Sequence, residues 1–195
     1  MAYPIYLTIG NIPKQICWKL SSHLQVLIGY ILTTKLASIS SHATWHWVVG
    51  NLFYACLYRV LGPIGSYGKT GLEMSSGDGI WCWCHLIFTI YVGDYLEQIL
   101  VTCTYFSSCP KCIVLVGQLG KYKSFPPHTQ SAALNIYDLA NGDVYPFHLA
   151  CYKAGLKLVY HPFWETLPLT NIFLSITPDI LHQMLQGMVN YLVYK

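Results

Sequence analysis

The chain has 195 residues and a mass of 22.1 kDa, which is ordinary for one domain and short for two. Hydrophobic residues make up 54% and charged residues only 10%, against roughly 25% charged residues in an average soluble domain. This composition excludes a disordered chain, and the lack of sustained charged positions excludes a coiled coil. The net charge of +3 gives no dense basic surface of the kind that marks many nucleic-acid-binding proteins.

The first part of the chain predicts two strands followed by a helix. Residues 3–9 and 24–32 are rich in β-branched, aromatic and aliphatic residues, which favour strands. Ser41 can cap a helix, which Gly62-Pro63 should end. Apolar residues recur along this helix at a helical spacing. They are Trp45, Val48, Leu52, Cys56 and Val60.

The middle of the chain changes from extended segments to loops and short helices. Residues 73–83 and 85–92 predict an extended pair, and the Gly-Asp-Gly sequence at 77–79 predicts a turn within the first of them. Two short helices are predicted over 132–140 and 147–154. The mixture of strands and helices predicts an α/β or α+β fold in one domain.

The last helix has the clearest signals. Thr177 can cap it, Pro178 occupies the favoured first position, and Asp179 complements the helix dipole. His182 shares a face with Asp179, and a lone histidine beside apolar neighbours is usually a core residue. Apolar residues form one wide stripe at Ile180, Leu181, Met184, Leu185, Met188, Val189 and Leu192. We expect this stripe to face a core.

Neither a membrane span nor a signal peptide is predicted. A spanning helix needs roughly 20 apolar residues in a row, whereas the window 86–101 is interrupted by Asp94, Glu97 and Gln98. The apolar run 24–32 is too short, and the N-terminus lacks a positive region and a cleavage site. We therefore expect an intracellular protein whose eight cysteines are reduced, some of them as possible metal ligands.

Cys109 and Cys112 form a CxxC motif, the spacing with which two thiolates bind one Zn²⁺ from a tight turn. Two further ligands would be needed, and the candidates are Cys103, His148, Cys151, His161 and His182. Since no second CxxC exists, two unligated thiols are the alternative. A redox pair is less favoured, because the apolar run after Cys112 does not start a helix.

Asp94 follows the apolar run 86–92, at the point where a strand would end. Many Mg²⁺-dependent nucleases present a metal ligand in this way, because the strand fixes the carboxylate while its oxygens face solvent. From the residues alone, a turn aspartate after Gly93 is the favoured interpretation.

Several strings, in collinear order over nearly the whole chain, resemble one family, the Plavaka-type transposases of fungal genomes within the CACTA-like group. The strings are YPIYLTIGNIPK (3–14), GYILTTKL (29–36), GLEMSSGDGIW (71–81), CHLIFTIYVGDYLEQILVTC (84–103), CPKC (109–112), GLKLVYHPFWETLPLTNIFLSITPDILHQMLQG (155–187) and NYLV (190–193).

The resemblance implies an α/β, partial RNase H-like domain that carries out metal-dependent phosphoryl transfer on DNA with Mg²⁺ or Mn²⁺. It implies that Asp94, in the GDY motif, is the middle acidic ligand. It further implies a Zn²⁺ knuckle at Cys109 and Cys112, inserted after that aspartate, with His182 as a possible further ligand. The DNA of the transposon ends is the implied partner and the nucleus the implied location.

The chain departs from the family pattern in two respects. The first catalytic aspartate of the family would lie upstream of Met1, and the third acid has no assigned position. Where relatives usually have Arg, this chain has Trp45, His46, Trp47, Cys82 and Trp83, and where they have Pro it has Leu20, Ile31-Leu32, Leu86 and Leu96. Such changes can each arise from one C-to-T change, which indicates a copy decayed by cytosine deamination.

These observations predict a single incomplete catalytic domain. It comprises a sheet-forming part (1–103), a loop-rich insertion with the CxxC motif (104–170) and the terminal helix (171–195). We expect an inactive transposase fragment. The alternatives are a co-opted module that binds DNA or protein without catalysis, and a relic with no selected role. The apolar surface gained where Arg became Trp also predicts self-association.

Overall fold

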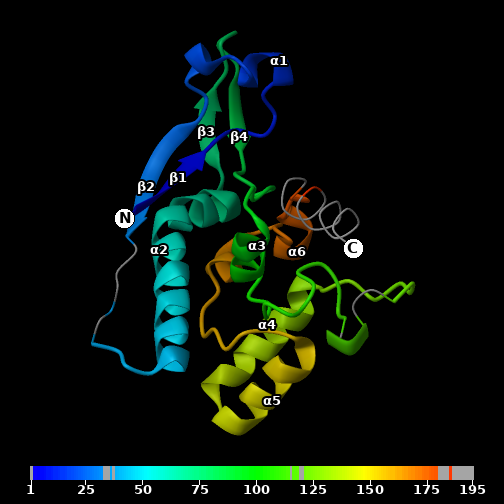
Figure 1. Cartoon of the computed structure of the whole chain (residues 1–195). Helices are drawn as coiled ribbons and strands as arrows, with labels where there is room; N and C mark the ends of the chain where they lie inside the picture. Colours follow the sequence, from blue (N-terminus) through cyan, green and yellow to red (C-terminus); the bar gives the residue numbers. More distant parts are fainter. Residues whose placement is uncertain are drawn as a thin grey trace. The chain divides into compact units, whose positions relative to one another are not determined.

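The computed structural model describes residues 2–32, 36, 38–114, 116–118, 121–179 and 185 (Figure 1). The chain divides into two compact units, Met1–Leu86 and Ile87–Lys195. Residues 85–92, which lie within the predicted sheet-forming part (1–103), join neither sheet. Of the predicted terminal helix, the start at Thr177, Pro178 and Asp179 is described and is in no helix, whereas the remainder, with His182, lies outside the described residues apart from Leu185.

Two predicted strands form the first sheet of the N-terminal unit. Strand β1 (Ala2–Leu7) pairs antiparallel with β2 (Val26–Leu32), and the register shifts between Ile5 and Tyr6. Between these strands lie two short helices, α1 (Lys14–Cys17) and η1 (Leu20–Ser22). The strand predictions at 3–9 and 24–32 are confirmed with slightly shorter bounds.

Helix α2 (His42–Thr70) begins where the sequence predicts and ends eight residues later than expected. The Oγ of Ser41 accepts a hydrogen bond from the Thr44 amide at 3.4 Å, which confirms the N-cap. The helix continues through Pro63 and ends at Gly71, whose amide donates to the Tyr67 carbonyl at 2.9 Å. The predicted stop at Gly62-Pro63 is therefore wrong: an exposed proline interrupts the backbone hydrogen bonds of this long helix without ending it.

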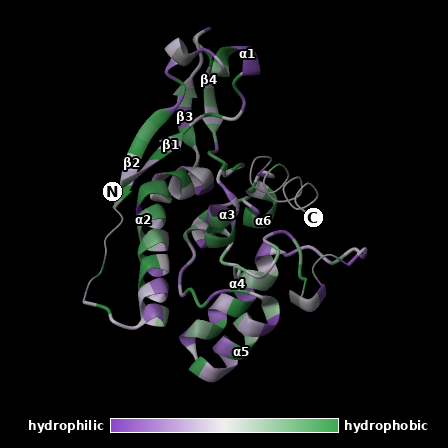
Figure 2. Ribbon diagram, in the orientation of Figure 1, coloured by the Kyte–Doolittle hydropathy of each residue, from purple (hydrophilic) through white to green (hydrophobic). Residues whose placement is uncertain are grey.

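The face of α2 that is buried differs from the predicted stripe. Leu52, a member of that stripe, is exposed. The buried residues are Tyr54, Leu57, Leu61, Gly65 and Gly68. A Cβ on Gly29 of β2 would lie 3.7 Å from Val60, so the helix packs against the strand at ordinary contact distance. Figure 2 shows hydrophobic residues along much of α2 and β2, which explains why periodicity alone did not select the face.

A hairpin completes this unit, as the Gly-Asp-Gly turn predicted. Strands β3 (Leu72–Ser75) and β4 (Trp81–Cys84) pair antiparallel. In the turn, Asp78 accepts hydrogen bonds from the Ser76 hydroxyl and from the Ile80 amide, and these bonds lower the pKa of its carboxyl. Both strands thus come from the first predicted segment, and the expected pairing with residues 85–92 is wrong.

The C-terminal unit is built from short helices around an aromatic core. The helices are α3 (Tyr95–Val101), η2 (Val116–Gln118), α4 (Gln130–Asp138), η3 (Leu139–Asn141), α5 (Val144–Ala154), η4 (Phe163–Thr166) and α6 (Ile172–Ser175). Helices α4 and α5 confirm the two predicted near these positions. The indole of Trp164 is fully buried and donates to the Val101 carbonyl at 3.0 Å. Phe147, Phe163 and Phe173 are buried as well.

Mixed helix and sheet content confirms the coarse α/β fold class. The described residues contain two two-stranded antiparallel sheets and isolated bridges, and no larger sheet of the RNase H type is among them. One of these bridges pairs Tyr91 with Ile176 in parallel, which is all the pairing that the predicted strand 85–92 makes.

Helix α2 is long and apolar enough to cross a membrane by length and composition, and no other helix of the described residues is. This segment is neither of the two apolar stretches, 24–32 and 86–101, on which the prediction of no membrane span was based. One such helix is a weak indication, because core helices of soluble proteins pass the same test.

Candidate functional site

Asp94 lies at the N-terminus of α3 rather than at the end of a strand. Its Oδ1 accepts a hydrogen bond from the Glu97 amide at 2.8 Å, so it is the N-cap of the helix. The strand-end placement is therefore wrong, because the preceding residues make only the Tyr91 bridge before the chain turns into α3. The position of the aspartate is set by the helix that it caps.

Glu97 completes an acidic pair with Asp94. Burial and the nearby Asp94 charge raise the pKa of the Glu97 carboxyl, while a backbone hydrogen bond from Asp94 acts in the opposite direction. Side chain and backbone of the two residues thus bond reciprocally, as in a capping box. Burial, together with the charges of Glu97 and Asp94, also raises the pKa of the Tyr91 hydroxyl. This environment holds two carboxylates close together at the predicted catalytic position.

The segment before α3 is fixed by bonds to residues far along the chain. Gln98 is buried, and its Nε2 donates to the Gly93 carbonyl at 3.0 Å and to the Thr177 carbonyl at 2.7 Å. The Tyr91 amide donates to the Ser175 carbonyl at 2.8 Å. These bonds position Asp94 without the strand that the sequence predicted.

Cys109 and Cys112 lie together, as the CxxC spacing predicts. The Lys111 amide, between them, donates a hydrogen bond to the Cys109 Sγ at 3.4 Å. Burial, together with the neighbouring Cys109, raises the pKa of the Cys112 thiol to about 11. Two sulfur donors are therefore presented by one tight turn, with a backbone N–H directed at one of them.

Most of the other predicted ligands lie elsewhere. Cys103 and Cys151 are both fully buried and form a second pair, in which burial and then the Cys103 charge raise the pKa of Cys151 to about 12. His161 lies 3.3 Å from the Glu165 carboxylate, and His148 is exposed on α5. His182 is outside the described residues. In the part of the chain that the structure describes, no group of three or more His, Cys, Asp or Glu could hold a metal ion as it stands.

His128 is a candidate that the sequence analysis missed. Its amide donates to the Lys111 carbonyl at 3.0 Å, and Cys112 bridges to Pro127, so it lies on the segment paired with the CxxC turn. Its ring is buried and stacks on Phe173, with 4.9 Å between the ring centroids. Its Nε2 is buried and has no hydrogen-bond partner. Burial lowers the pKa of this imidazole, which favours the neutral form. The one signal for this residue in the sequence is that a histidine follows the CxxC motif.

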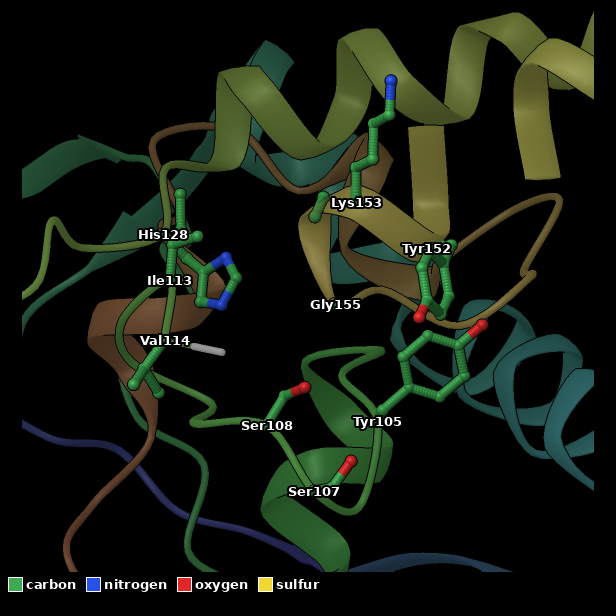
Figure 3. A pocket seen from close by; sticks show the side chains of 10 residues that line it. Tyr105, Ser107, Ser108, Ile113, Val114, His128, Tyr152, Lys153 and Gly155 are labelled. Atoms are coloured by element: carbon green, nitrogen blue, oxygen red, sulfur yellow. The ribbon is translucent and has the colours of Figure 1, made fainter. Parts of the chain in front are cut away.

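A pocket of about 300 Å³ opens beside His128 (Figure 3). It is lined by Tyr105, Ser107, Ser108, Ile113, Val114, His128, Tyr152, Lys153, Ala154 and Gly155. Figure 3 shows the imidazole and the Ser108 hydroxyl on the same pocket as the tyrosine rings. Gly155 has φ +69° at the C-cap of α5, and a Cβ there would lie 3.0 Å from the Ser108 Oγ. The lining includes hydroxyl, imidazole and amine groups and no carboxylate.

The family model of the Plavaka transposase matches residues 1–194. The chain belongs to the Plavaka transposase family. This match confirms the resemblance seen in the sequence and covers both compact units. No curated protein and no solved structure matches the chain.

Proposed function

We propose that the chain derives from a cut-and-paste DNA transposase and binds the DNA of the transposon ends, acting in the nucleus. The observation that carries this proposal is the family match over residues 1–194. The chain has 11 basic and 8 acidic residues, so its binding to DNA would rest on a modest number of phosphate contacts.

Asp94 is, in this proposal, a ligand of the catalytic Mg²⁺ or Mn²⁺. Two such ions stabilise the attacking and leaving oxygens during in-line displacement at phosphorus, which is the chemistry of an RNase H-like transposase. Asp94 would contribute a carboxylate whose position is fixed by α3, and Glu97 supplies a second carboxylate nearby. These are the oxygen donors that Mg²⁺ prefers.

A second candidate function is a module that binds DNA or protein without cleaving DNA. It is favoured because Asp94 already accepts the Glu97 amide as a helix cap, and because the described residues contain no group of three metal-binding side chains. Two-metal chemistry needs carboxylates that together hold both ions. We therefore expect the chain by itself to bind DNA and to leave it intact.

The two candidates separate in one set of assays on the full chain. DNA binding is measured by fluorescence anisotropy on duplexes with the element's terminal sequence and on scrambled duplexes, over a series of salt concentrations. Nicking and strand transfer are measured on the same duplexes with Mg²⁺ and with Mn²⁺. Binding that prefers the terminal sequence supports the transposase origin of the function, and equal binding to both duplexes, or none, contradicts it.

Asp94→Asn tests the metal ligand without removing the helix cap, because asparagine caps about as well as aspartate. The matched control is Asp143→Asn, since Asp143 caps α5 of the same unit by accepting the Tyr145 amide at 3.1 Å. Metal-dependent nicking that is lost in Asp94→Asn and kept in Asp143→Asn assigns the catalytic role to Asp94. Absence of nicking in the unaltered chain, with DNA binding retained, selects the non-catalytic module.

A further inference from the structure

We propose that the pocket beside His128 binds a single nucleobase, presented by a nucleotide that is turned out of a DNA duplex. This inference rests on the proposed binding of DNA and names the part of the DNA that the C-terminal unit would hold. The pocket volume of about 300 Å³ lies at the lower end of the range of roughly 300–1,000 Å³ found for small-molecule sites. It therefore suits one base rather than a large cofactor.

Backbone hydrogen bonds hold the walls of the pocket in place. The loop that carries Tyr105 is joined to the end of α5, because the Tyr105 amide donates to the Gly155 carbonyl at 3.0 Å. The segment that carries His128 is joined to the CxxC turn, because the His128 amide donates to the Lys111 carbonyl at 3.0 Å. A Cβ on Gly155 would lie 3.0 Å from the Ser108 Oγ, so the glycine keeps the space in front of this hydroxyl open. The pocket is therefore formed before a ligand binds.

Apart from Lys153, the polar groups that line the pocket are uncharged. Burial lowers the pKa of the His128 imidazole, which is therefore neutral at pH 7. Burial, and then the neighbouring Cys151 and Tyr152, raise the pKa of the Tyr105 hydroxyl, which therefore keeps its proton. Serine hydroxyls complete the polar lining, and no carboxylate is among the lining residues. Such groups donate and accept hydrogen bonds without a charge, which suits the edge of a nucleobase.

The imidazole of His128 has a nitrogen without a hydrogen-bond partner. The side chain is 6% exposed, and its Nε2 is buried and unpartnered. Buried polar atoms nearly always have a partner, so an exception on the wall of a pocket indicates a ligand that supplies one. Because Nε2 is covered in the free chain, a small rotation of the ring accompanies this bond. The edge of a base carries both donors and acceptors, so it can bond to this nitrogen in either tautomer of the imidazole.

Two tyrosines give the pocket an aromatic side. Figure 3 shows the rings of Tyr105 and Tyr152 next to each other, across the pocket from the imidazole. Tyr152 is 75% exposed, so most of its ring is free to contact a ligand. Nucleobases stack on aromatic side chains whatever their sequence, because every base has a π-face. The tyrosines thus offer the stacking surface, while the imidazole and the hydroxyls offer hydrogen bonds to the edge of the base.

Lys153 is the one cation among the residues that line the pocket. Figure 3 shows its ammonium group directed away from the tyrosine rings and the imidazole. The residue is exposed on the last turn of α5. An ammonium group outside the pocket suits a phosphate, because contacts to phosphate fix the position of DNA while the base is held separately. This placement favours a base attached to a phosphate backbone over an uncharged aromatic molecule.

Fluorescence anisotropy of the full chain with three labelled duplexes tests the pocket. The duplexes share one sequence and differ at the centre, which carries a normal base pair, one extra unpaired base, or an abasic residue in place of that extra base. Turning a base out of the stack costs least when the base has no pairing partner, so the unpaired base should increase the affinity by about tenfold. The abasic duplex has the same backbone without the base and should lack this gain.

Tyr152→Ala should remove the gain, because the stacking surface is lost. Tyr145→Ala is the matched control, since Tyr145 is 73% exposed on the same helix and does not line the pocket. His128→Phe keeps an aromatic ring next to Phe173 and removes the unpartnered nitrogen. It should reduce the gain by about two- to tenfold without lowering the free energy of unfolding, which a merely structural histidine would not do.

Equal affinity for the unpaired-base and abasic duplexes, or a gain that persists in Tyr152→Ala, overturns the pocket proposal. Binding of the paired duplex then still supports the proposed function. Titration calorimetry with a deoxynucleoside monophosphate distinguishes a base in DNA from a free nucleotide. Binding of the monophosphate that is lost in Tyr152→Ala, without binding of any duplex, assigns the pocket to free nucleotides and contradicts both the DNA source of the base and the proposed function. No binding of any of these ligands contradicts both proposals.

Discussion

Gly71 lies between the end of α2 and the start of β3, and both its backbone conformation and a neighbouring side chain restrict this position to glycine. Its φ of +78° is in the region that favours glycine. A Cβ at this position would also overlap the indole of Trp83, whose Nε1 donates to the Thr70 carbonyl at 3.1 Å. The tryptophan thereby packs over the glycine, although its side chain remains largely exposed.

Gly71→Ala should therefore destabilise the protein more than Gly79→Ala. Gly79 has a similar φ of +82°, but a Cβ there would meet nothing within 4 Å, so its replacement costs only the backbone strain of roughly 1–2 kcal/mol. At Gly71 the displaced indole adds roughly 1–3 kcal/mol. Urea unfolding of both variants measures the difference, and equal losses would show that the Trp83 contact contributes nothing.

Glu97 predicts a dependence of stability on pH. Burial and the Asp94 charge raise its pKa above 4.5, the value expected in the unfolded chain. A carboxyl with a raised pKa binds its proton more tightly in the folded state, so the contribution of Glu97 to stability is fully present below pH 4.5 and is lost as pH rises through the folded pKa. Glu97→Gln should remove this fall, because the amide carries no charge and can still accept the Asp94 N–H.

Thermal unfolding of Glu97→Gln and of the unaltered chain from pH 4 to pH 8 measures this effect. The difference in Tm should favour the variant increasingly toward neutral pH. Glu73→Gln is the control, since Glu73 is exposed on β3. A variant that loses stability equally at every pH would indicate that the carboxylate mainly supports the helix cap.

Among the elements, those with explicit start or turn signals were predicted well. Ser41 caps α2, and the Gly-Asp-Gly sequence forms the hairpin turn. The strand prediction for residues 85–92 failed, because an apolar run of this length has no local signal that distinguishes a strand from a connecting segment. Its one ladder contact, Tyr91 with Ile176, depends on a residue 85 positions later in the chain.

In the candidate site, too, the contact within one short motif was predicted, whereas the contact between segments distant in the sequence was not. The CxxC spacing brought Cys109 and Cys112 together because the motif spans one turn. The capping bond of Asp94 was missed because the apolar run before it suggested a strand, although Glu97 three residues later is the second half of a capping signature. His128 was missed because its pairing with Lys111 joins segments that no spacing rule connects.

Pro63 lies in the interior of helix α2 and is exposed. A proline in a helix interior removes one backbone hydrogen bond and its ring crowds the preceding turn, at a cost of roughly 3 kcal/mol. Pro63→Ala should therefore raise the free energy of unfolding by about 1–3 kcal/mol, since no buried contact is lost.

Pro146→Ala is the matched control, because Pro146 lies in the first turn of α5, after the Asp143 cap, where a proline costs little. Urea unfolding and the helical circular dichroism signal measure both variants. A loss of stability in Pro63→Ala would indicate that α2 depends on a bend at this position.

At the scale of the whole molecule, large apolar side chains are exposed while charges are few. Trp18 and Trp81 are 75% and 68% exposed, whereas Trp164 is completely buried. Each exposed tryptophan presents a large apolar surface to solvent, and exposed apolar surfaces favour contacts between protein molecules. With charged residues at 10%, little electrostatic repulsion opposes association.

We therefore expect the purified chain to self-associate, with a mass that rises above 22.1 kDa as concentration increases. Trp18→Ser combined with Trp81→Ser should shift the mass toward that of the monomer, because both side chains are exposed and their loss opens no cavity. Tyr122→Ser is the control: Tyr122 is more exposed than either tryptophan but lies between Lys121 and Lys123, whose charges disfavour burial. Light scattering after size-exclusion chromatography, at low and high salt, measures the effect.

Apolar association should persist at high salt, where phosphate contacts to DNA weaken, so the two kinds of binding are separable in one titration. Unchanged association in the double variant would place the contact on another surface.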